Sequence, residues 1–471
     1  MNTIIKELFP ELPKYCRSDK QEVHIHPKVE KFLEIALEGR GGAVALGKAT
    51  LVSSFYGKIS KLLFTLPSYA TDNELSSTAI KSLISELPKT TNFVVVHHNS
   101  NQECIRQWFV ETGHPLQNIQ FVPMSDDIEF TDWAEDPYVS AVDLEDGNYQ
   151  LIEPYSFSRS GDQFIADEIE SAEIGIAATQ KPLVFEGGNC LICDTFWLLG
   201  WDYISDTIDL FKSDHSPVSM PAGSDEFKFV SDLFGNMIES KRKLIHIGTQ
   251  CETYREATYG ARENGVWYLD CPNTGTGRYH PIFHIDMFIT PLGRGEDDKF
   301  RFLVGCPRLG ANLTGQPTPY ARAEAYDEIA NNLRNEGFIV IRNPIVHRPR
   351  LGEEVTLAAL EAKLEGPDGD TLWNGLEELR ALGAKSEDKI RSRNWYHITW
   401  NNCLVENAGA EKCVYLPTFG HGRNADLKKL DDCTEELFES EGFKVKRLAD
   451  FDDFAQRDGV VHCITKYLQR G

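Results

Sequence analysis

The sequence of 471 residues lacks the features that mark membrane, secreted and nucleic-acid-binding proteins. No apolar run reaches the roughly 20 residues that a membrane-spanning helix needs. The start, MNTIIKELFPELPKYCRSDK, has no basic segment followed by an apolar one, so we do not expect a secretory signal. Positive charge is scarce: 48 Lys and Arg against 72 Asp and Glu give a net charge of −24, with no basic patch to attract nucleic acid. These absences favour a cytoplasmic protein with no nucleic-acid or membrane partner.

The 11 cysteines are odd in number and scattered, which argues against a disulfide framework. Cys190 and Cys193 form the only CxxC, and on a strand two residues three apart face opposite ways. We therefore expect buried free thiols here, in preference to a zinc or redox pair. Long Gly/Ser/Pro linkers and low-complexity tracts are also missing, so nothing in the sequence predicts separate domains.

What the sequence does contain is a repeated order of strand, helix and strand. A strand that ends at Pro67 is followed by a helix with a capping box at Thr71 and Glu74. A strand over residues 92–98 comes next. The helix has the apolar face expected of one that packs on a sheet, made of Ile80, Leu83, Ile84 and Leu87.

Two later copies of this unit share short motifs. Pro-x-x-Gly occurs at 307–310 and 417–420, and Glu-Gly-Phe-x-Val-x-Arg occurs at 336–342 and 441–447. The Gly of the second motif stands where a helix C-cap is expected. Copies this long and this far apart do not predict a solenoid; they predict one α/β domain built around a pseudo-symmetry axis.

Two segments, 202–250 and 345–392, interrupt the repeat, and we interpret both as partly helical insertions. We expect one catalytic domain over residues 61–471. Residues 1–60 are expected to form an N-terminal extension that packs on it.

Several stretches place polar groups at the ends of apolar runs. In FHIDMFIT, His284 and Asp286 are two apart, so on a strand they share a face, and the carboxylate favours the imidazolium. In LVFEGGNCLI, the Gly-Gly pair suggests a bulge or a close backbone approach that would aim Glu186 inward, with His284 as a candidate partner. Each stretch on its own also has an ordinary structural explanation. The first could be a partly exposed strand face, and the second could be a tight turn that leaves Glu186 in solvent.

Two further stretches carry an acid beside an aromatic ring and a thiol beside a histidine. Asp136 precedes Pro137 and is therefore extended, and Trp133 offers an apolar wall, a combination that suits a planar cation. A solvated acidic loop with one buried Trp explains it equally. Cys463, next to His462, follows an expected strand and is a candidate nucleophile, although free cysteines are usually just buried.

The combination is more specific than its parts. One thiol, one or two histidines, three carboxylates and few basic residues describe a negative pocket that suits a guanidinium, because carboxylates accept paired hydrogen bonds from its planar fork. Paired carboxylates can localise the charge and orient the central carbon for attack by a thiolate.

These stretches resemble the guanidino-group-modifying superfamily, the penteins, and within it the agmatine deiminase and bacterial peptidylarginine deiminase family. VVHCITK resembles the family's HCIT signature, FHIDMF its His-x-Asp motif, FEGGN its Glu-Gly-Gly motif, WAEDP its Trp-x-Arg-Asp motif and NNCLVEN its Asn-containing strand. The five motifs occur in the family's order. The resemblance implies a five-bladed, pseudo-fivefold α/β propeller of ββαβ modules with insertions, in agreement with the repeats.

The resemblance also implies roles for individual residues. Cys463 would be the nucleophile, and His284 the general acid and base, oriented by Glu186. Asp136 and Asp286 would clamp the guanidinium. Substrate binding would involve Trp133, Glu135, Asn189 and Asn402, of which Asn402 could instead position the nucleophile. The implied reaction converts agmatine or a related small cation to a ureido product and ammonia through a covalent cysteine intermediate, with no metal and no organic cofactor.

The departures from the family leave the substrate open. Glu135 stands where the family has Arg, and at a pocket mouth it would accept an amine or repel an α-carboxylate. Peptidyl arginine is the alternative substrate, amidinotransfer to an amine is the alternative reaction, and a degenerate pentein that only binds a partner is the non-enzymatic alternative. On a strand His462 would point away from Cys463, so we expect His284 to be the catalytic histidine.

Overall fold

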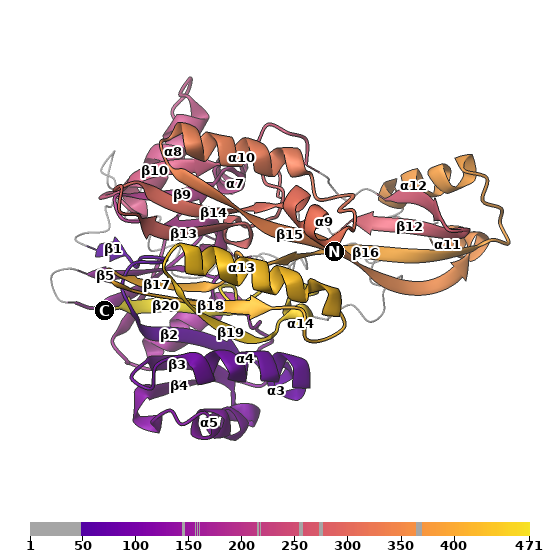
Figure 1. Ribbon diagram of the computed structural model, residues 1–471. Helices are drawn as coiled ribbons and strands as arrows, with labels where there is room; N and C mark the ends of the chain where they lie inside the picture. Colours follow the sequence, from indigo (N-terminus) through magenta and orange to yellow (C-terminus); the bar gives the residue numbers. More distant parts are fainter. Residues whose placement is uncertain are drawn as a thin grey trace.

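The computed structural model describes residues 49–143, 147–155, 157, 159, 161–213, 216, 218–253, 258–272, 277–363 and 370–471. Most of the predicted N-terminal extension lies outside these residues. Within them the chain has a mixed α/β fold whose strands form five sheets (Figure 1). A search of the described helices finds none with the length and apolar character of a membrane span. The ten cysteines that the structure describes are free thiols.

The described residues contain five units in which an antiparallel pair of strands is joined, through helix, to a third strand parallel to the second; in four units the strands follow one another along the chain, and in the fifth the first strand, β20, comes last in the chain. The first strands are β5 (Val139–Asp143), β8 (Cys190–Ile192), β13 (Ile289–Arg294), β17 (Leu404–Ala408) and β20 (Thr465–Arg470). The second strands are β6 (Tyr149–Glu153), β9 (Phe196–Gly200), β14 (Phe300–Cys306), β18 (Glu411–Thr418) and β2 (Ile59–Leu66). The third strands are β7 (Ile176–Gln180), β10 (Lys243–Ile247), β15 (Ile339–Thr356), β19 (Lys444–Asp450) and β3 (Asn92–His98). The predicted ββαβ order is therefore present, and the closure of the units around a pseudo-fivefold axis stays a prediction.

Helices connect the second and third strands, because a parallel pair needs a crossover of a dozen residues or more. They are α3 (Ser68–Asp72), α4 (Glu74–Glu86), α6 (Ile165–Ser171), α7 (Trp201–Lys212), α8 (Glu226–Met237), α9 (Pro307–Thr314), α10 (Ala323–Asn335) and α13 (Lys428–Ser440). Further elements are β1 (Ala49–Leu51), which pairs with β5, α5 (Gln102–Glu111) and β4 (Ile119–Met124), which extend the β2–β3 sheet, and α14 (Asp452–Ala455).

The segment 202–250, expected to be an insertion, forms α7, α8 and β10. Because β10 pairs in parallel with β9, this segment supplies the helices and third strand of one repeated unit. Its helices bury Phe211, Val230 and Phe234 in a core shared with β8 and β9.

Helix α4 shows how the sequence pattern becomes structure. The predicted apolar face is buried, each of its four residues being at most 1% exposed. The cap differs from the prediction: Asn73 caps the helix, and its side chain accepts hydrogen bonds from the backbone N–H groups of Leu75 and Ser76. Thr71 lies in the short helix α3 and donates to Ser68 instead. The two predicted C-cap glycines, Gly337 and Gly442, have the positive φ values that such a position favours.

The segment 345–392 forms most of an arm that stands apart from the five units (Figure 1). The arm contains β11 (Tyr259–Glu263), β12 (Val266–Pro272), α11 (Leu357–Lys363), α12 (Asp370–Ala381) and the outer parts of β15 and β16 (Lys389–Thr399). Its strands run in the order β11-β12-β16-β15. The arm has its own apolar core, which includes Trp267, Leu269, Leu360, Leu376 and Ile390.

Candidate active site

The polar motifs lie in tight turns that directly precede strands, although they were expected to lie on the strands themselves. Cys463 lies in a turn over residues 461–464, directly before β20. Asp286 lies in the 3-10 helix Ile285–Met287 before β13, and Glu186 precedes the 3-10 helix Gly187–Asn189 before β8. In a turn, neighbouring side chains need not alternate between two faces, and the expectation that His462 points away from Cys463 is wrong, because both approach Oδ2 of Asp286.

Cys463 is fully buried, and its surroundings come from three other motifs. Its Sγ lies 3.9 Å from Oδ2 of Asp286 and 3.7 Å from Sδ of Met287. The backbone N–H of Cys463 donates to Oδ1 of Asn402 at 3.2 Å, and its carbonyl accepts from the N–H of Glu135 at 3.1 Å. These hydrogen bonds fix the turn, and with it the direction of the thiol.

His284 forms the second half of the site. Its Nε2 lies 2.7 Å from Oε2 of Glu186 and 3.0 Å from the hydroxyl of Tyr203. The predicted partnership of His284 and Glu186 is therefore confirmed. Its Nδ1 is buried, has no hydrogen-bond partner among the described residues, and lies 3.8 Å from Oδ1 of Asp136. Because Glu186 and Tyr203 hold Nε2, Nδ1 is the ring atom through which a proton could be exchanged with a bound molecule.

The Gly-Gly pair makes these approaches possible, as the sequence suggested. A Cβ on Gly188 would lie 2.4 Å from Nδ1 of His284 and 3.2 Å from Oδ2 of Asp286. A Cβ on Gly187 would lie 1.9 Å from the carbonyl oxygen of Glu135. A side chain at either position would therefore push the histidine or the loop of Glu135 out of place.

Asp136 has a cationic partner that the sequence analysis did not foresee. Nη2 of Arg159 donates to Oδ2 of Asp136 at 2.8 Å, and Nε of Arg159 donates to Asp162 at 2.5 Å. The arginine side chain is 5% exposed, and both carboxylates are fully buried. The expectation of few basic residues in the pocket is corrected here. No motif or spacing in the sequence marks Arg159.

Glu135 does not lie at the pocket mouth as an open charge. It is 4% exposed, and Nζ of Lys466 donates to its Oε1 at 2.8 Å and to its carbonyl at 3.3 Å. Burial raises the pKa of Glu135, and the attraction of Lys466 works against that rise. Glu135 therefore forms an internal ion pair in place of the expected contact with a substrate amine. This ion pair links the WAEDP motif to the HCITK segment.

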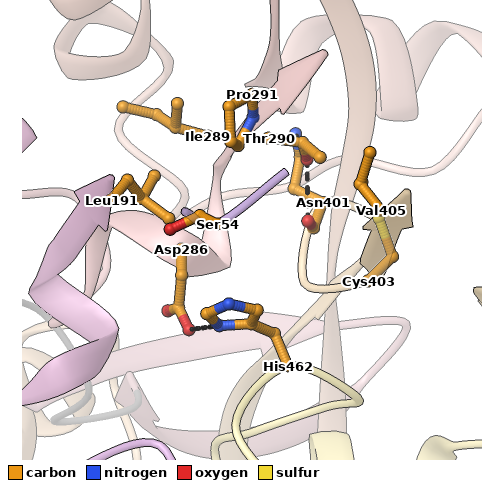
Figure 2. Close-up of a pocket in the computed structure, with 10 residues that line it drawn as sticks. All are labelled: Ser54, Leu191, Asp286, Ile289, Thr290, Pro291, Asn401, Cys403, Val405 and His462. Atoms are coloured by element: carbon orange, nitrogen blue, oxygen red, sulfur yellow. Dashed lines mark hydrogen bonds and ion pairs between the residues drawn. The ribbon is translucent and has the colours of Figure 1, made fainter. Parts of the chain in front are cut away.

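His462 also contacts the site, through Asp286. Its Nδ1 lies 2.8 Å from Oδ2 of Asp286, an interaction that Figure 2 shows at one end of a cavity. Burial lowers the pKa of His462, but Glu135 and the hydrogen bond to Asp286 outweigh it and raise the pKa above its usual value. Asp286 is thus shared by His462 and the thiol. The cavity walls beyond it are largely apolar, and neither Cys463 nor His284 lines them.

The remaining predicted residues mostly support the frame. Trp133 is fully buried, lies edge-on to Phe454 and has the guanidinium carbon of Arg457 5.1 Å from its ring. Asn189 accepts from the N–H of Ile285 and so holds the His284 turn. Nδ2 of Asn402 is buried without a hydrogen-bond partner among the described residues.

The charges of the site are arranged in two halves. Asp136, Glu186 and His284 place one ligand atom each within 4.8 Å of one another, a grouping that could accept a cation. In the other half, Lys466 pairs with Glu135 and His462 pairs with Asp286. Glu186, with its side chain 22% exposed, is the most accessible of the five predicted catalytic residues, so the half of the site that contains Glu186 and His284 is the one reached from solvent.

The fold can be compared with solved structures. No protein-family model matches the sequence, and no curated protein matches it at significance. A candidate agmatine deiminase superposes with a TM-score of 0.53 at 13% identity, covering 89% of this chain and 95% of that one. The agmatine deiminase of Enterococcus faecalis gives 0.51 at 12% identity, with 89% and 95% covered. A candidate peptidyl-arginine deiminase gives 0.50 at 12%, with 90% and 100% covered.

These likenesses define the class of fold: it is the pentein fold, as the motif resemblance implied. The three compared structures are described as agmatine or peptidyl-arginine deiminases, two of them as candidates. At this identity the likeness concerns the fold. The activity has to be argued from the site.

Proposed function

We propose that the protein is a guanidino-group hydrolase, a deiminase that uses Cys463 as its nucleophile. The observation that carries this proposal is that four separate motifs meet around a thiol and a histidine. Asp286 lies 3.9 Å from Sγ of Cys463, while His284 is held by Glu186 and lies 3.8 Å from Asp136. A thiol, a histidine with one ring nitrogen directed inward, and two carboxylates are the groups that attack on a guanidinium requires.

In the first half of the reaction, a guanidinium binds with its N–H groups toward Asp136 and Asp286. The thiolate of Cys463 attacks the central carbon and forms a C–S bond. Nδ1 of His284 gives a proton to the leaving nitrogen, the C–N bond breaks, and ammonia departs. A thiouronium-type intermediate stays bound to the sulfur.

In the second half, His284 takes a proton from a water molecule that attacks the same carbon. The C–S bond breaks, the sulfur leaves as thiolate, and the ureido product is released. Glu186 stabilises the imidazolium that exists before the first transfer and after the second, and between them His284 is neutral. Asn402 acts on the nucleophile, because its Oδ1 accepts from the backbone N–H of Cys463.

Agmatine or a related small cation is the substrate that we propose first. The net charge of −24 and the acidic half around Glu186 favour a cation at the entrance. Peptidyl arginine is the alternative, followed by amidinotransfer to an amine and by a protein that binds without turnover.

A panel of agmatine, arginine and arginyl peptides, assayed for ammonia and ureido product, tests the proposal. We expect turnover of at least one compound and a loss of about a thousandfold or more in Cys463→Ala, because the covalent route is then closed. Cys403→Ala is the matched control, since Cys403 is also a buried thiol but has no place in the proposed reaction. Product without ammonia, formed only with an added amine, would indicate amidinotransfer. Equal activity in Cys463→Ala and the wild type would refute the nucleophile assignment.

A further inference from the structure

Arg159 places a guanidinium of the protein on a carboxylate that we assign to the substrate's guanidinium. We propose that Arg159 is a specificity-determining residue: it shares Asp136 with the substrate and weakens the binding of cationic guanidino compounds. The inference rests on the proposed function of Asp136, and it concerns affinity, not the chemical steps.

The contacts show that Arg159 is firmly held. Its Nε and Nη2 donate to two different carboxylates, Asp162 and Asp136. Asp162 is fixed in turn by Thr131, whose backbone N–H and hydroxyl donate to it at 2.6 and 2.7 Å. The Phe157 ring lies 4.8 Å from the guanidinium carbon. A planar fork bound on two edges is a strong, directional arrangement.

The two oxygens of Asp136 consequently face different neighbours. Oδ2 accepts from Arg159, and Oδ1 faces Nδ1 of His284 at 3.8 Å. A substrate that approaches from the His284 side meets Oδ1 of a carboxylate that, together with Asp162, already pairs with one guanidinium. Like charges that share a buried carboxylate repel one another, since the interior screens them weakly.

The consequence is that Arg159 weakens the binding of guanidinium compounds to this site. With Arg159 neutralised, the same carboxylates would carry an uncompensated charge and bind a guanidinium more tightly. Uniform binding of this kind lowers KM without raising kcat. A residue that only maintained the fold would change stability and kcat, and it would not selectively tighten cation binding.

Calorimetric titration of agmatine and of methylguanidine into Cys463→Ala protein tests the inference without turnover. We expect Arg159→Gln to tighten both about tenfold, because a like charge is removed beside the shared carboxylate. Arg159→Lys, which keeps the charge, should change little. In active protein, Arg159→Gln should lower KM with kcat within about twofold. Arg334→Gln, an exposed arginine on α10, is the control.

The outcomes separate the two proposals. Binding that is unchanged or weaker in Arg159→Gln, with folded protein, overturns the inference and leaves the proposed function standing. Absence of binding in every variant, together with absence of turnover, overturns the proposed function and the inference with it. If Arg159→Gln does not fold, Arg159→Lys decides: a changed affinity despite the retained charge would contradict the charge-based argument.

Discussion

Among the described arginines that lie between two carboxylates, one in the site and one in the arm make an informative contrast. In the site bridge, which we define as Asp136, Arg159 and Asp162, the arginine joins two fully buried acids. In the arm cage, Arg393 donates to Asp270 and Glu263 of the β11–β12 hairpin. The chemistry is the same, but the surroundings differ in ways that predict different roles.

The arm cage is closed by aromatic rings. The guanidinium carbon of Arg393 lies 3.9 Å from the centroid of Tyr268 and 5.4 Å from that of Trp395. Asp270 also accepts from the indole N–H of Trp395 and from the hydroxyl of Tyr320. Every group in the cage is engaged by the arm or its base, which is the arrangement of a structural ion pair.

The site bridge, by contrast, adjoins a reactive group. Asp136 faces Nδ1 of His284, which has no hydrogen-bond partner among the described residues. The comparison therefore teaches that burial between two acids does not by itself show whether an arginine has a functional or a structural role. What decides is whether one of the acids also faces an unsatisfied polar group.

The largest effect that this comparison predicts is the loss of the arm cage. Arg393→Ala leaves Asp270, whose side chain is 3% exposed, without its counter-ion, and breaking a buried pair costs about 3–5 kcal/mol. We expect a loss of that order in the free energy of unfolding, measured by urea titration, with kcat/KM within about threefold of wild type.

Arg391→Ala is the matched control, because Arg391 lies on the same strand with its side chain 39% exposed and a 3.8 Å contact to Glu354. We expect it to cost less than about 1 kcal/mol. A collapse of activity in Arg393→Ala that stability does not explain would mean that the arm belongs to the catalytic machinery, and the contrast between the two arginines would fail.

The second prediction concerns two buried histidines beside the arm cage, where the ring of His347 lies 6.5 Å from that of Trp395. His347 on β15 pairs with His397 on β16, and their ring centroids are 3.8 Å apart. Burial lowers the pKa of His347 to about 3 and also lowers that of His397, with His347 as a second cause there. Because folding lowers these pKa values, the unfolded chain binds protons more readily as the pH falls below about 6.5. The stability that depends on these two neutral histidines is therefore fully present above that pH, and it declines as the pH falls toward 3.

Each histidine contributes up to about 1.4 kcal/mol per pH unit in that window. We expect His347→Phe to reduce the slope of unfolding free energy against pH between 6.5 and 5 by about that amount, as measured by urea titrations at several pH values. His421→Phe, an exposed histidine, is the control. An unchanged slope in His347→Phe would show that other groups govern acid unfolding.

The sequence predicted the parts of the fold that depend on local pattern. The apolar face of α4 and the glycines after α10 and α13 follow from helical periodicity and backbone geometry, which neighbouring residues reveal. The partnership of Glu186 and His284 could also be predicted, because an acid that the Gly-Gly pair aims inward needs a partner and few candidates exist.

The sequence did not predict the cationic partners. Lys466 and Glu135 are 331 residues apart, and Arg159 lies in a segment with no periodic pattern. Hydrophobic periodicity reports which side chains are buried, but it does not say which charged groups meet. The turns at Cys463 and Asp286 were missed for a related reason: apolar residues in a buried turn read like a strand when only composition is considered.

The smallest effect expected is also the sharpest test of the difference between the two arginines. Removal of the Arg159 side chain should leave a buried space beside Asp136 and Asp162 that accepts a free guanidinium ion. For a dissociation constant of about 10 mM, 10 mM guanidinium stabilises the folded state by about 0.4 kcal/mol. We expect that gain in Arg159→Ala in thermal unfolding, and none in the wild type, where Arg159 occupies the space.

Arg393→Ala should gain less, because Glu263, with its side chain 55% exposed, leaves that end of the cage open to water. Equal gains in both variants would show that the two sites bind guanidinium alike, and the role of Arg159 in specificity would then rest only on its nearness to His284.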